Sequence, residues 1–278
     1  ASANCDYIVV CVGSDWLQEG EFLVNLGNVK KKPKGSGGDR ADLRIPEEDV
    51  TLIRALSTLD KKLIVNIMGG SAYVIKDWID LADSVVMSFY SGLEGGNALA
   101  DILSGDVTPA GKLPFTIAEK AEDYPPFLHL GAKDKNIEYG YYHGYTLFDK
   151  KGIDAHFPFG FGLSYTDFEL NAPTCEKDGD IIKVKATVKN IGKVDGDEVI
   201  QIYIGSDIKD IDRPVKVLKG FKRVSVKAKE SIITEVEVLI DDIRFYNPEN
   251  GSWELDESYT VYIGTDSKNV TAAGKITF

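Results

Sequence analysis

The chain has 278 residues, enough for about two domains of ordinary size or for one large barrel. Hydrophobic residues make up 43% and charged residues 27%, a globular composition that excludes a largely disordered or collagen-like protein. A formal net charge of -12 disfavours nucleic acid as a partner, and the apolar runs fall far short of the roughly 20 residues that cross a bilayer, so no membrane span is expected.

The first hundred residues alternate between strand patterns and helix patterns. Short apolar runs predict strands at 7–12, 62–68 and 84–89. Helices are expected from Pro46 to Leu59, where proline and acids occupy the first turn, and at 72–81 and 94–103. This alternation predicts an α/β fold with a parallel sheet and ligand-binding loops at the carboxyl ends of its strands. Three or four such units are too few to close an eightfold barrel.

The middle and the end of the chain follow different patterns. Residues 111–165 are rich in proline, glycine and aromatic residues, and we expect an extended connector packed on the α/β layers. From Thr166 onward, short segments of alternating polarity are separated by turns containing Asn, Asp and Gly. About seven such strands predict a β-sandwich of the immunoglobulin or fibronectin type III style. The predicted domains are therefore 1–165 and 166–278.

Several kinds of chemistry lack their sequence patterns. Ser71 is not in a GxSxG turn, and the histidines at 129, 143 and 156 lie in the connector, where structural roles are expected. No glycine pattern of a nucleotide-binding loop is present. Residues 207–212 lack the glycine and the closing glutamate of a calcium loop, so we expect an exposed acidic turn there. The sequence therefore predicts neither a cofactor nor a metal.

The cysteines and the start of the chain bear on localisation. Cys5, Cys11 and Cys175 are too few and too scattered for a disulfide framework, and none forms a CxxC pair for zinc. Free thiols favour a reducing, cytoplasmic compartment. The chain starts with Ala-Ser-Ala-Asn and enters a strand within a few residues, without a visible signal peptide. We expect that it begins inside a longer protein, so its localisation stays open.

Carboxylates are the remaining candidates for chemistry. Asp15, Glu19 and Glu21 follow the first predicted strand, where a parallel sheet presents a ligand-facing loop. Trp16 supplies an aromatic surface of the kind that packs on sugar rings. Position alone favours a solvated acidic loop, and a catalytic or sugar-binding role stays open at this point.

Ten stretches carry a further signal. They lie at Val12–Gly13, Gly37–Pro46, Leu52–Leu56, Gly92–Asp106, Pro109–Thr116, Tyr142–Tyr145, Phe157–Thr166, Val188–Gly192, Gly196–Ile204 and Leu218–Phe221. The first seven resemble the carboxyl-terminal half of glycoside hydrolase family 3, the β-glucosidase and β-xylosidase family. The last three resemble the fibronectin type III-like domain appended to that half. The resemblance spans nearly the whole chain in the correct order.

This resemblance implies part of a retaining β-glycosidase, most similar to a β-glucosidase, that hydrolyses terminal non-reducing β-linked sugars. In the family, a (β/α)8-type barrel supplies an aspartate nucleophile and the α/β domain supplies a glutamate acid/base. A retaining reaction needs both carboxyl groups about 5–5.5 Å apart. The implied partners are a β-linked glucoside or oligosaccharide and a barrel domain, on another chain or on a missing segment. The alternative is a non-catalytic carbohydrate-binding or structural fragment.

The resemblance also implies site residues. Glu19 lies six residues beyond Gly13, at the position that resembles the family's acid/base, and Glu21 is the neighbouring alternative. Trp16, chosen for its aromatic ring and its place in this loop, is the candidate for sugar binding. Ser14-Asp15-Trp16 copies the triplet around the family's barrel nucleophile, but everything downstream resembles the α/β domain. Asp15 is therefore not expected to be a nucleophile.

A departure from the family motif supports Glu19. Other members carry Glu-Gly-x-Asp-Arg, whereas this chain has Ser36-Gly-Gly-Asp39-Arg40 after an insertion of basic and glycine residues. The glutamate of that motif is thus missing here. Asp39 and Arg40 match the motif, and we expect them to fix the loop through an ion pair.

Overall fold

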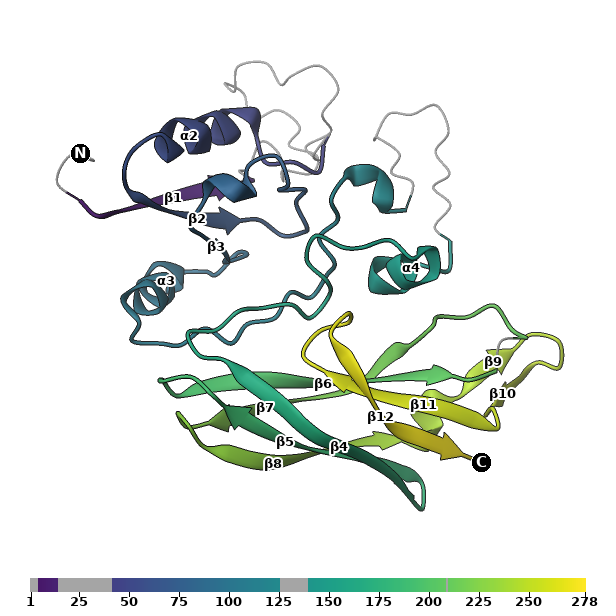
Figure 1. The fold of residues 1–278 in the computed structure, drawn as a ribbon. Coiled ribbons are helices and arrows are strands. Elements are labelled where there is room, and N and C mark those ends of the chain that lie inside the picture. The colour runs from purple at the N-terminus through teal and green to yellow at the C-terminus, as the bar shows by residue number, and fades with distance from the viewer. Residues whose placement is uncertain (1–4, 15–41, 126–139, 209) are drawn as a thin grey trace, which may run out of the picture. The chain divides into compact units, whose positions relative to one another are not determined.

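The computed structural model describes residues 5–14, 42–125, 140–208 and 210–278. The chain separates into two compact units, Ala1–Ala100 with Ile117–Tyr141, and Asp101–Thr116 with Tyr142–Phe278. The first unit holds a parallel sheet and the second holds antiparallel sheets (Figure 1). The predicted fold class, an α/β part followed by an all-β sandwich, is confirmed. No helix in the described ranges is long and apolar enough to span a membrane.

The sheet of the first unit has three strands in the order β1-β2-β3. Their bounds are β1 Tyr7–Gly13, β2 Lys62–Met68 and β3 Ser84–Met87. Two helices match the sequence pattern, α2 at Glu47–Ser57 and α3 at Gly95–Ser104. Three acidic residues occupy the first turn of α2, where they complement the helix dipole. The periodicity of the sequence therefore predicted these five elements well.

Helix α2 packs on one face of this sheet. It contacts both β1 and β2, and its Val50 and Ile53 are buried. Val10 of β1 and Val65 of β2 are buried as well. They are neighbours in the parallel register, so their side chains lie on the same face. Burial of these branched side chains against α2 forms the core of the first unit.

The segment after β2 differs from the prediction. A helix was expected at 72–81, but the structure has only one 3₁₀ turn, at Ile79–Leu81. Tyr73, Val74 and Ile75 are all buried, which a helix packed through one face cannot achieve for consecutive residues. The Val74 N–H donates to the Leu43 carbonyl at 2.8 Å rather than to a helical partner. The helix prediction was wrong because tertiary contacts, not helical periodicity, account for this apolar run.

The connector also differs from the prediction. It contains a 3₁₀ turn at Ala121–Asp123 and the helix α4 at Gly144–Lys151, which the pattern did not reveal. Tyr145 accepts a hydrogen bond from the Leu218 N–H at 2.9 Å. The connector is thus divided between the units: Ile117–Tyr141 belongs to the unit with the parallel sheet, and 142–165 belongs to the unit that contains the sandwich.

A glycine in the connector allows a close approach to the sandwich. Gly160 has φ +84°, and a Cβ atom on it would lie 2.3 Å from Oε1 of Gln201. The Gln201 amide donates from Nε2 to the Gly160 carbonyl at 3.2 Å. Only glycine satisfies both the left-handed conformation and this approach.

The sandwich consists of a four-stranded sheet, β12-β11-β6-β7, and a three-stranded sheet, β4-β5-β8. The strand bounds are β4 Phe168–Asp178, β5 Ile181–Asn190, β6 Gly196–Ser206, β7 Val217–Val226, β8 Ser231–Leu239, β11 Ser258–Gly264 and β12 Val270–Thr277. Inward-facing residues of both sheets, such as Ile182 and Ile202, form one buried core. The prediction of about seven sandwich strands is confirmed. A short hairpin, β9 Phe245–Asn247 and β10 Ser252–Glu254, is an addition that the sequence did not reveal.

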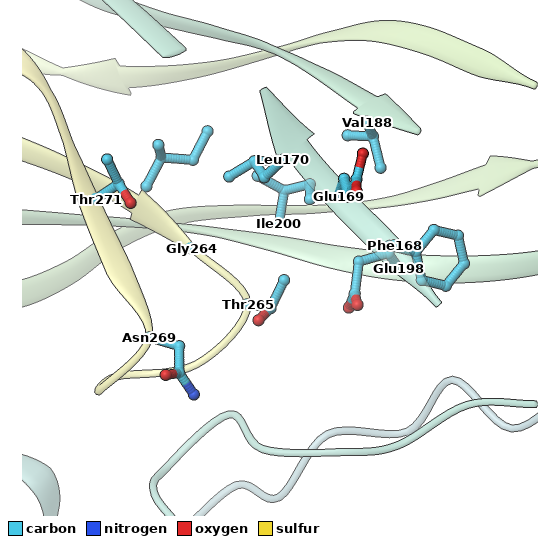
Figure 2. Close-up of a pocket in the computed structure, with 11 residues that line it drawn as sticks. Phe168, Glu169, Leu170, Val188, Glu198, Ile200, Gly264, Thr265, Asn269 and Thr271 are labelled. Carbon is cyan, nitrogen blue, oxygen red and sulfur yellow. The ribbon is translucent and has the colours of Figure 1, made fainter. Parts of the chain in front are cut away.

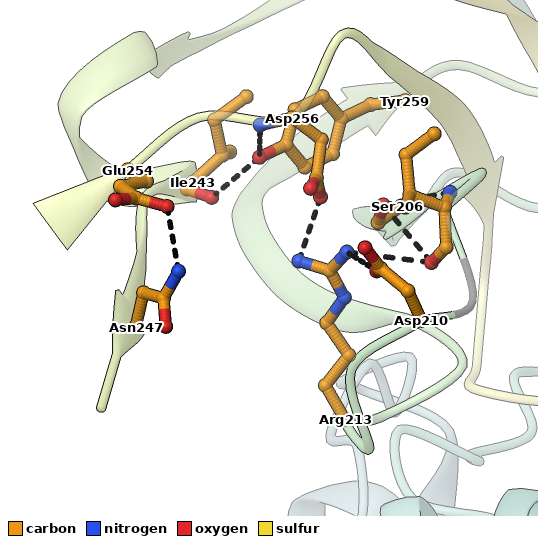
Figure 3. A network of polar contacts seen from close by, with 9 residues as sticks. Ser206, Asp210, Arg213, Ile243, Asn247, Glu254, Asp256 and Tyr259 are labelled. Atoms are coloured by element: carbon orange, nitrogen blue, oxygen red, sulfur yellow. Dashed lines mark hydrogen bonds and ion pairs between the residues drawn. The ribbon is translucent and has the colours of Figure 1, made fainter. Parts of the chain in front are cut away.

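A buried ion pair lies beside this hairpin (Figure 3). Nη1 of Arg213 lies 2.6 Å from Oδ2 of Asp256, and their side chains are only 13% and 7% exposed. The guanidinium also stacks 4.4 Å from the ring centroid of Phe245. The Asp256 N–H donates to the Tyr259 hydroxyl at 2.9 Å. Removal of either charged side chain would leave the other buried without a counter-charge. We therefore assign this cluster a structural role.

Candidate functional site

The sequence places the candidate site just beyond β1, at the carboxyl edge of the parallel sheet. Gly13 and Ser14 are the last described residues there. The predicted site residues all lie outside the described residues, as does Asp15: they are Trp16, Glu19, Glu21, Asp39 and Arg40. Their roles stay predictions. The structure describes the residues that come before and after the 15–41 stretch.

The end of β1 is fixed to its neighbours through Gly13. A Cβ atom on this residue would lie 1.9 Å from the carbonyl oxygen of Met68, and its φ of +130° also favours glycine. The Gly13 N–H donates to Oδ2 of Asp49 at 3.1 Å. The next N–H, of Ser14, donates to the Met68 carbonyl at 3.0 Å. The chain therefore leaves the sheet from a position held by both β2 and α2.

Tyr73 holds the same point through a side chain. Its hydroxyl lies 2.5 Å from the Ser14 hydroxyl, and the residue is only 1% exposed. Its neighbour Val74 donates to the carbonyl of Leu43, just beyond the 15–41 stretch. The dipeptide Tyr73–Val74 thus contacts the chain on both sides of the stretch that contains every predicted site residue. Sequence reasoning missed this role because it assigned the dipeptide to a helix.

An ion pair lies just after that stretch. Nη2 and Nε of Arg44 donate to Oδ2 of Asp42 at 2.7 and 2.9 Å. The hydrogen bond from Arg44 lowers the pKa of the Asp42 carboxyl. Both side chains are about half exposed, so the pair contributes little to stability. The sequence analysis expected such a pair at Asp39 and Arg40 and did not consider this one.

The third strand ends at the same edge in an unusual conformation. The Ser88 N–H donates to the Ile67 carbonyl at 3.0 Å, which keeps the chain beside β2. Phe89 then has φ +54°, in the left-handed region that bulky residues rarely adopt. Such backbone strain tends to cluster at functional sites. Together with the fixed end of β1, it favours this edge as the functional part of the first unit.

The pocket in the second unit is smaller than a typical small-molecule binding site. It has a volume of about 150 Å³, below the roughly 300 Å³ of typical small-molecule sites. It is lined by Phe168, Glu169, Leu170, Val188, Glu198, Ile200, Ile263, Gly264, Thr265, Asn269 and Thr271 (Figure 2). The Glu198 carboxylate lies 2.7 Å from Nζ of Lys112, with both side chains nearly enclosed. Because Lys112 neutralises this carboxylate, we assign the pair to the connection between connector and sandwich.

The acidic turn at 207–212 is only partly as expected. Asp210 and Asp212 have well-exposed side chains. Asp207 is instead held by the hydroxyls of Thr260 and Ser258, at 2.6 and 2.7 Å, and these bonds lower its pKa to about 2. The sequence did not reveal this because the two hydroxyl residues lie more than fifty positions further along the chain.

The described histidines and the search for metal-binding clusters give no further candidate for a functional site. His143 occupies the position just before α4, and His156 packs edge-on against Phe157 with ring centroids 4.7 Å apart. The structural roles expected for these two histidines stay predictions, and His129 lies outside the described residues. Within the described part of the chain, no three His, Cys, Asp or Glu side chains gather as ligands for a metal ion.

Comparisons with known protein families cover both parts of the chain. The glycosyl hydrolase family 3 C-terminal domain matches residues 1–165, and the fibronectin type III-like domain matches residues 198–267. The chain is similar to β-glucosidase BoGH3A of Bacteroides ovatus, with 37% identity over 93% of this chain and 36% of the relative. It is also similar to a xylan 1,4-β-xylosidase of Xylanibacter ruminicola, with 32% identity over 94% and 28%.

A solved structure is similar over nearly the whole chain. The β-glucosidase D2-BGL from Chaetomella raphigera has a TM-score of 0.85 at 30% identity, over 98% of this chain and 40% of that one. The chain therefore spans between about a quarter and two fifths of the length of these three relatives.

Proposed function

Since the chain belongs to glycoside hydrolase family 3, a family of glycosidases, we propose that it is part of a retaining β-glucosidase that hydrolyses terminal non-reducing β-linked sugars. The observation that carries this proposal is the match to relatives named β-glucosidases along more than nine tenths of the chain. We place the α/β domain at 1–165 and the fibronectin type III-like domain at 166–278. A barrel domain outside these residues supplies the nucleophile.

In this proposal Glu19 is the general acid and then the general base. It protonates the leaving oxygen while the barrel's carboxylate attacks the anomeric carbon, and it then deprotonates the water that releases the sugar. A proton donor at neutral pH needs a carboxyl group whose pKa is raised, which burial provides. Trp16 packs on the sugar ring. The support from the described residues is that Gly13 and Ser14 are firmly held where this loop begins.

Replacement of Glu19 in the assembled enzyme, the chain together with its barrel domain, tests the assignment. Glu19→Ala should slow hydrolysis of alkyl glucosides more than about a hundredfold, because their leaving groups need protonation. Activated aryl glucosides should lose less in the first step, and azide should restore the second step by replacing the base-activated water. Glu21→Ala is the matched control and should resemble the parent. If Glu21→Ala shows this pattern instead, the acid/base is Glu21.

The chain alone should not hydrolyse nitrophenyl β-glucosides, because it lacks the second carboxyl group. Circular dichroism would first confirm that the isolated chain is folded. Turnover by the chain alone that Asp15→Asn abolishes would contradict this part of the proposal. Absence of turnover in the assembled enzyme as well would favour a non-catalytic role.

A further inference from the structure

The hairpin β9-β10 presents two aromatic side chains on one face. Tyr246 of β9 and Trp253 of β10 are partners in the antiparallel register, so they project from the same side of the hairpin. Their ring centroids lie 5.8 Å apart, with 64° between the ring planes. Tyr246 is 52% exposed and Trp253 is 63% exposed. These two residues, the aromatic pair, therefore form an angled surface that is open to solvent.

The opposite face of the hairpin is anchored separately. Phe245 of β9 packs against the guanidinium of Arg213, which lies 4.4 Å from its ring centroid. Glu254 of β10 accepts hydrogen bonds from the Asn247 amide and the Ser252 hydroxyl, both at 2.9 Å (Figure 3). A cross-strand aromatic pair also stabilises a hairpin, but these contacts fix the two strands through their other face. The outer side of the aromatic pair is thus left for a ligand.

Polar groups lie at one end of the aromatic pair. A Cβ atom on Gly251 would lie 3.8 Å from the Tyr246 hydroxyl, so the tyrosine side chain extends beside the turn of the hairpin. Asn250 and Ser252 flank this glycine and are exposed. Single exposed apolar residues are normal on protein surfaces, whereas adjoining ones with a polar rim mark interaction sites. The arrangement therefore favours a ligand that is both apolar on its faces and rich in hydrogen-bonding groups.

The charge of the hairpin restricts the ligand further. Glu249 and Glu254 are the charged side chains between 245 and 254, and the whole chain has a net charge of -12. Hydrogen bonds, above all from Asn247, hold the pKa of Glu254 below its ordinary value, so this carboxylate stays charged near neutral pH. Such a surface repels polyuronates, phosphates and anionic lipids. The ligand is therefore neutral or cationic.

The size of the aromatic pair argues against a protein partner. An aromatic side chain buries roughly 150–250 Å², so two of them fall well below the ~800 Å² that each partner buries in a standard protein interface. A narrow ligand that contacts little more than the two rings fits better. Extended sugar polymers are such ligands, because successive pyranose rings present apolar C–H faces and keep their hydroxyl groups in water.

We propose that the aromatic pair binds neutral β-glucan chains, with sugar rings packed on Tyr246 and Trp253. The inference goes beyond the proposed function, because it gives the fibronectin type III-like domain a binding role of its own. Membership of a glycosidase family favours a sugar polymer over other narrow neutral ligands such as proline-rich peptides. Binding here requires neither Glu19 nor a barrel domain, so the chain itself should show it.

Affinity gel electrophoresis of the full chain tests the proposal. Mixed-linkage β-glucan in the gel should retard the parent chain, and the retardation at several polymer concentrations gives a dissociation constant. Two cellulose ethers test the charge argument on one backbone: neutral hydroxyethylcellulose should retard the chain more than anionic carboxymethylcellulose, which Glu249 and Glu254 repel. Absence of retardation by both neutral polymers would overturn the proposal.

Variants of the two rings locate the contact. Trp253→Ala and Tyr246→Ala should each weaken β-glucan binding more than about tenfold, because each removes one ring from the surface. Tyr246→Phe keeps its ring and should lose less than about threefold. Phe221→Ala, at a 69% exposed aromatic position in β7, is the matched control and should bind like the parent. Equal binding by Trp253→Ala and the parent would contradict the inference.

Fluorescence quenching provides a test with the aromatic pair intact, in case the alanine variants disturb the hairpin. In a Trp16→Phe chain the remaining tryptophans are Trp78, which is 2% exposed, and Trp253. Acrylamide should therefore quench Trp253, and β-glucan should reduce this quenching at least about twofold, because a packed sugar ring shields the indole. Unchanged quenching would overturn the inference. Protection of Trp253 in the assembled enzyme without glucan would show that the barrel domain covers the pair, with the same consequence.

The outcomes separate this inference from the proposed function. An assembled enzyme that binds β-glucan through Trp253 but hydrolyses no glucoside contradicts the function and leaves the binding surface intact. An assembled enzyme that hydrolyses glucosides, from a chain that β-glucan does not retard, overturns the binding surface alone. Loss of retardation in Trp16→Ala but not in Trp253→Ala would move the contact to the predicted site loop and overturn the inference. Preference for a polyproline peptide over β-glucan would also overturn it.

Discussion

The hydroxyl groups of Ser14 and Tyr73 lie 2.5 Å apart, and this contact ties the end of β1 to the segment that follows β2. The bond is enclosed, because Tyr73 is almost completely buried. Gly69 makes room for it, since a Cβ atom there would lie 1.9 Å from the Tyr73 hydroxyl. Two positions distant in sequence therefore set where the candidate site loop begins.

Removal of the Tyr73 hydroxyl should destabilise the first unit. Tyr73→Phe should lower the free energy of unfolding by about 1 kcal/mol, the net value of a typical hydrogen bond. Gly69→Ala should cost about 1–3 kcal/mol, because the added methyl group displaces that hydroxyl. Urea unfolding gives both values. Tyr246→Phe, at an exposed position, is the control and should stay within about 0.5 kcal/mol of the parent. Equal stability of Tyr73→Phe and the parent would refute the argument.

The ion pair between Lys112 and Glu198 should be sensitive to loss of one partner. Lys112→Met leaves a nearly enclosed carboxylate without its counter-charge and should cost about 3–5 kcal/mol. The double variant Lys112→Met/Glu198→Met should be more stable than Lys112→Met, which a double-mutant cycle measures. Lys268→Met removes an exposed pair with Asp154 and should cost less than about 1 kcal/mol. A double variant less stable than both single variants would contradict this view.

Asp207 should make stability depend on pH. Its native pKa, about 2, lies below the ordinary value of 3.8, because hydroxyl donors favour the carboxylate. Its contribution is therefore fully present above about pH 3.8 and is lost as the pH falls through about 2. Asp207→Asn should be about 1–2 kcal/mol less stable than the parent at pH 7, and this difference should shrink between pH 4 and pH 2. Denaturation at several pH values checks this, and a constant difference would show that the charge is not responsible.

The sandwich should fold without the rest of the chain. Its core residues all lie between 182 and 276, so residues 166–278 retain the whole cluster and should unfold cooperatively. Residues 142–278 should melt at a higher temperature, because they add the contacts of Tyr145 and Gly160 with the sandwich. Tyr145→Phe in the longer segment should remove part of this gain. Calorimetry of both segments decides, and the absence of a cooperative transition in 166–278 would contradict autonomy.

The sequence was most informative where local periodicity and tertiary burial agree. The strands at β1 and β2 and the helix α2 have apolar residues at the spacing that their burial requires. The prediction failed at Tyr73–Ile75, whose burial depends on distant partners such as Leu43 and Ser14. The packing of the connector was missed for the same reason, since its partners lie in strands far along the chain.

For the candidate site, the sequence indicated the loop after Gly13 through a family resemblance. It did not indicate the residues that hold that loop in place. Tyr73 carries no local signal for this role, because a buried tyrosine in an apolar run resembles any core residue.

The fit of Gly160 against Gln201 limits how freely the fibronectin type III-like domain can be exchanged between relatives. A replacement domain would need a side chain at the position of Gln201 that accommodates the glycine turn, and an acid that matches Lys112. A domain with the same strands but without these two residues would leave a buried cation and a gap at the junction. Chimeric enzymes should therefore not be cut at Thr166, so that Lys112 and the turn at Gly160 are inherited together with the sandwich that they contact.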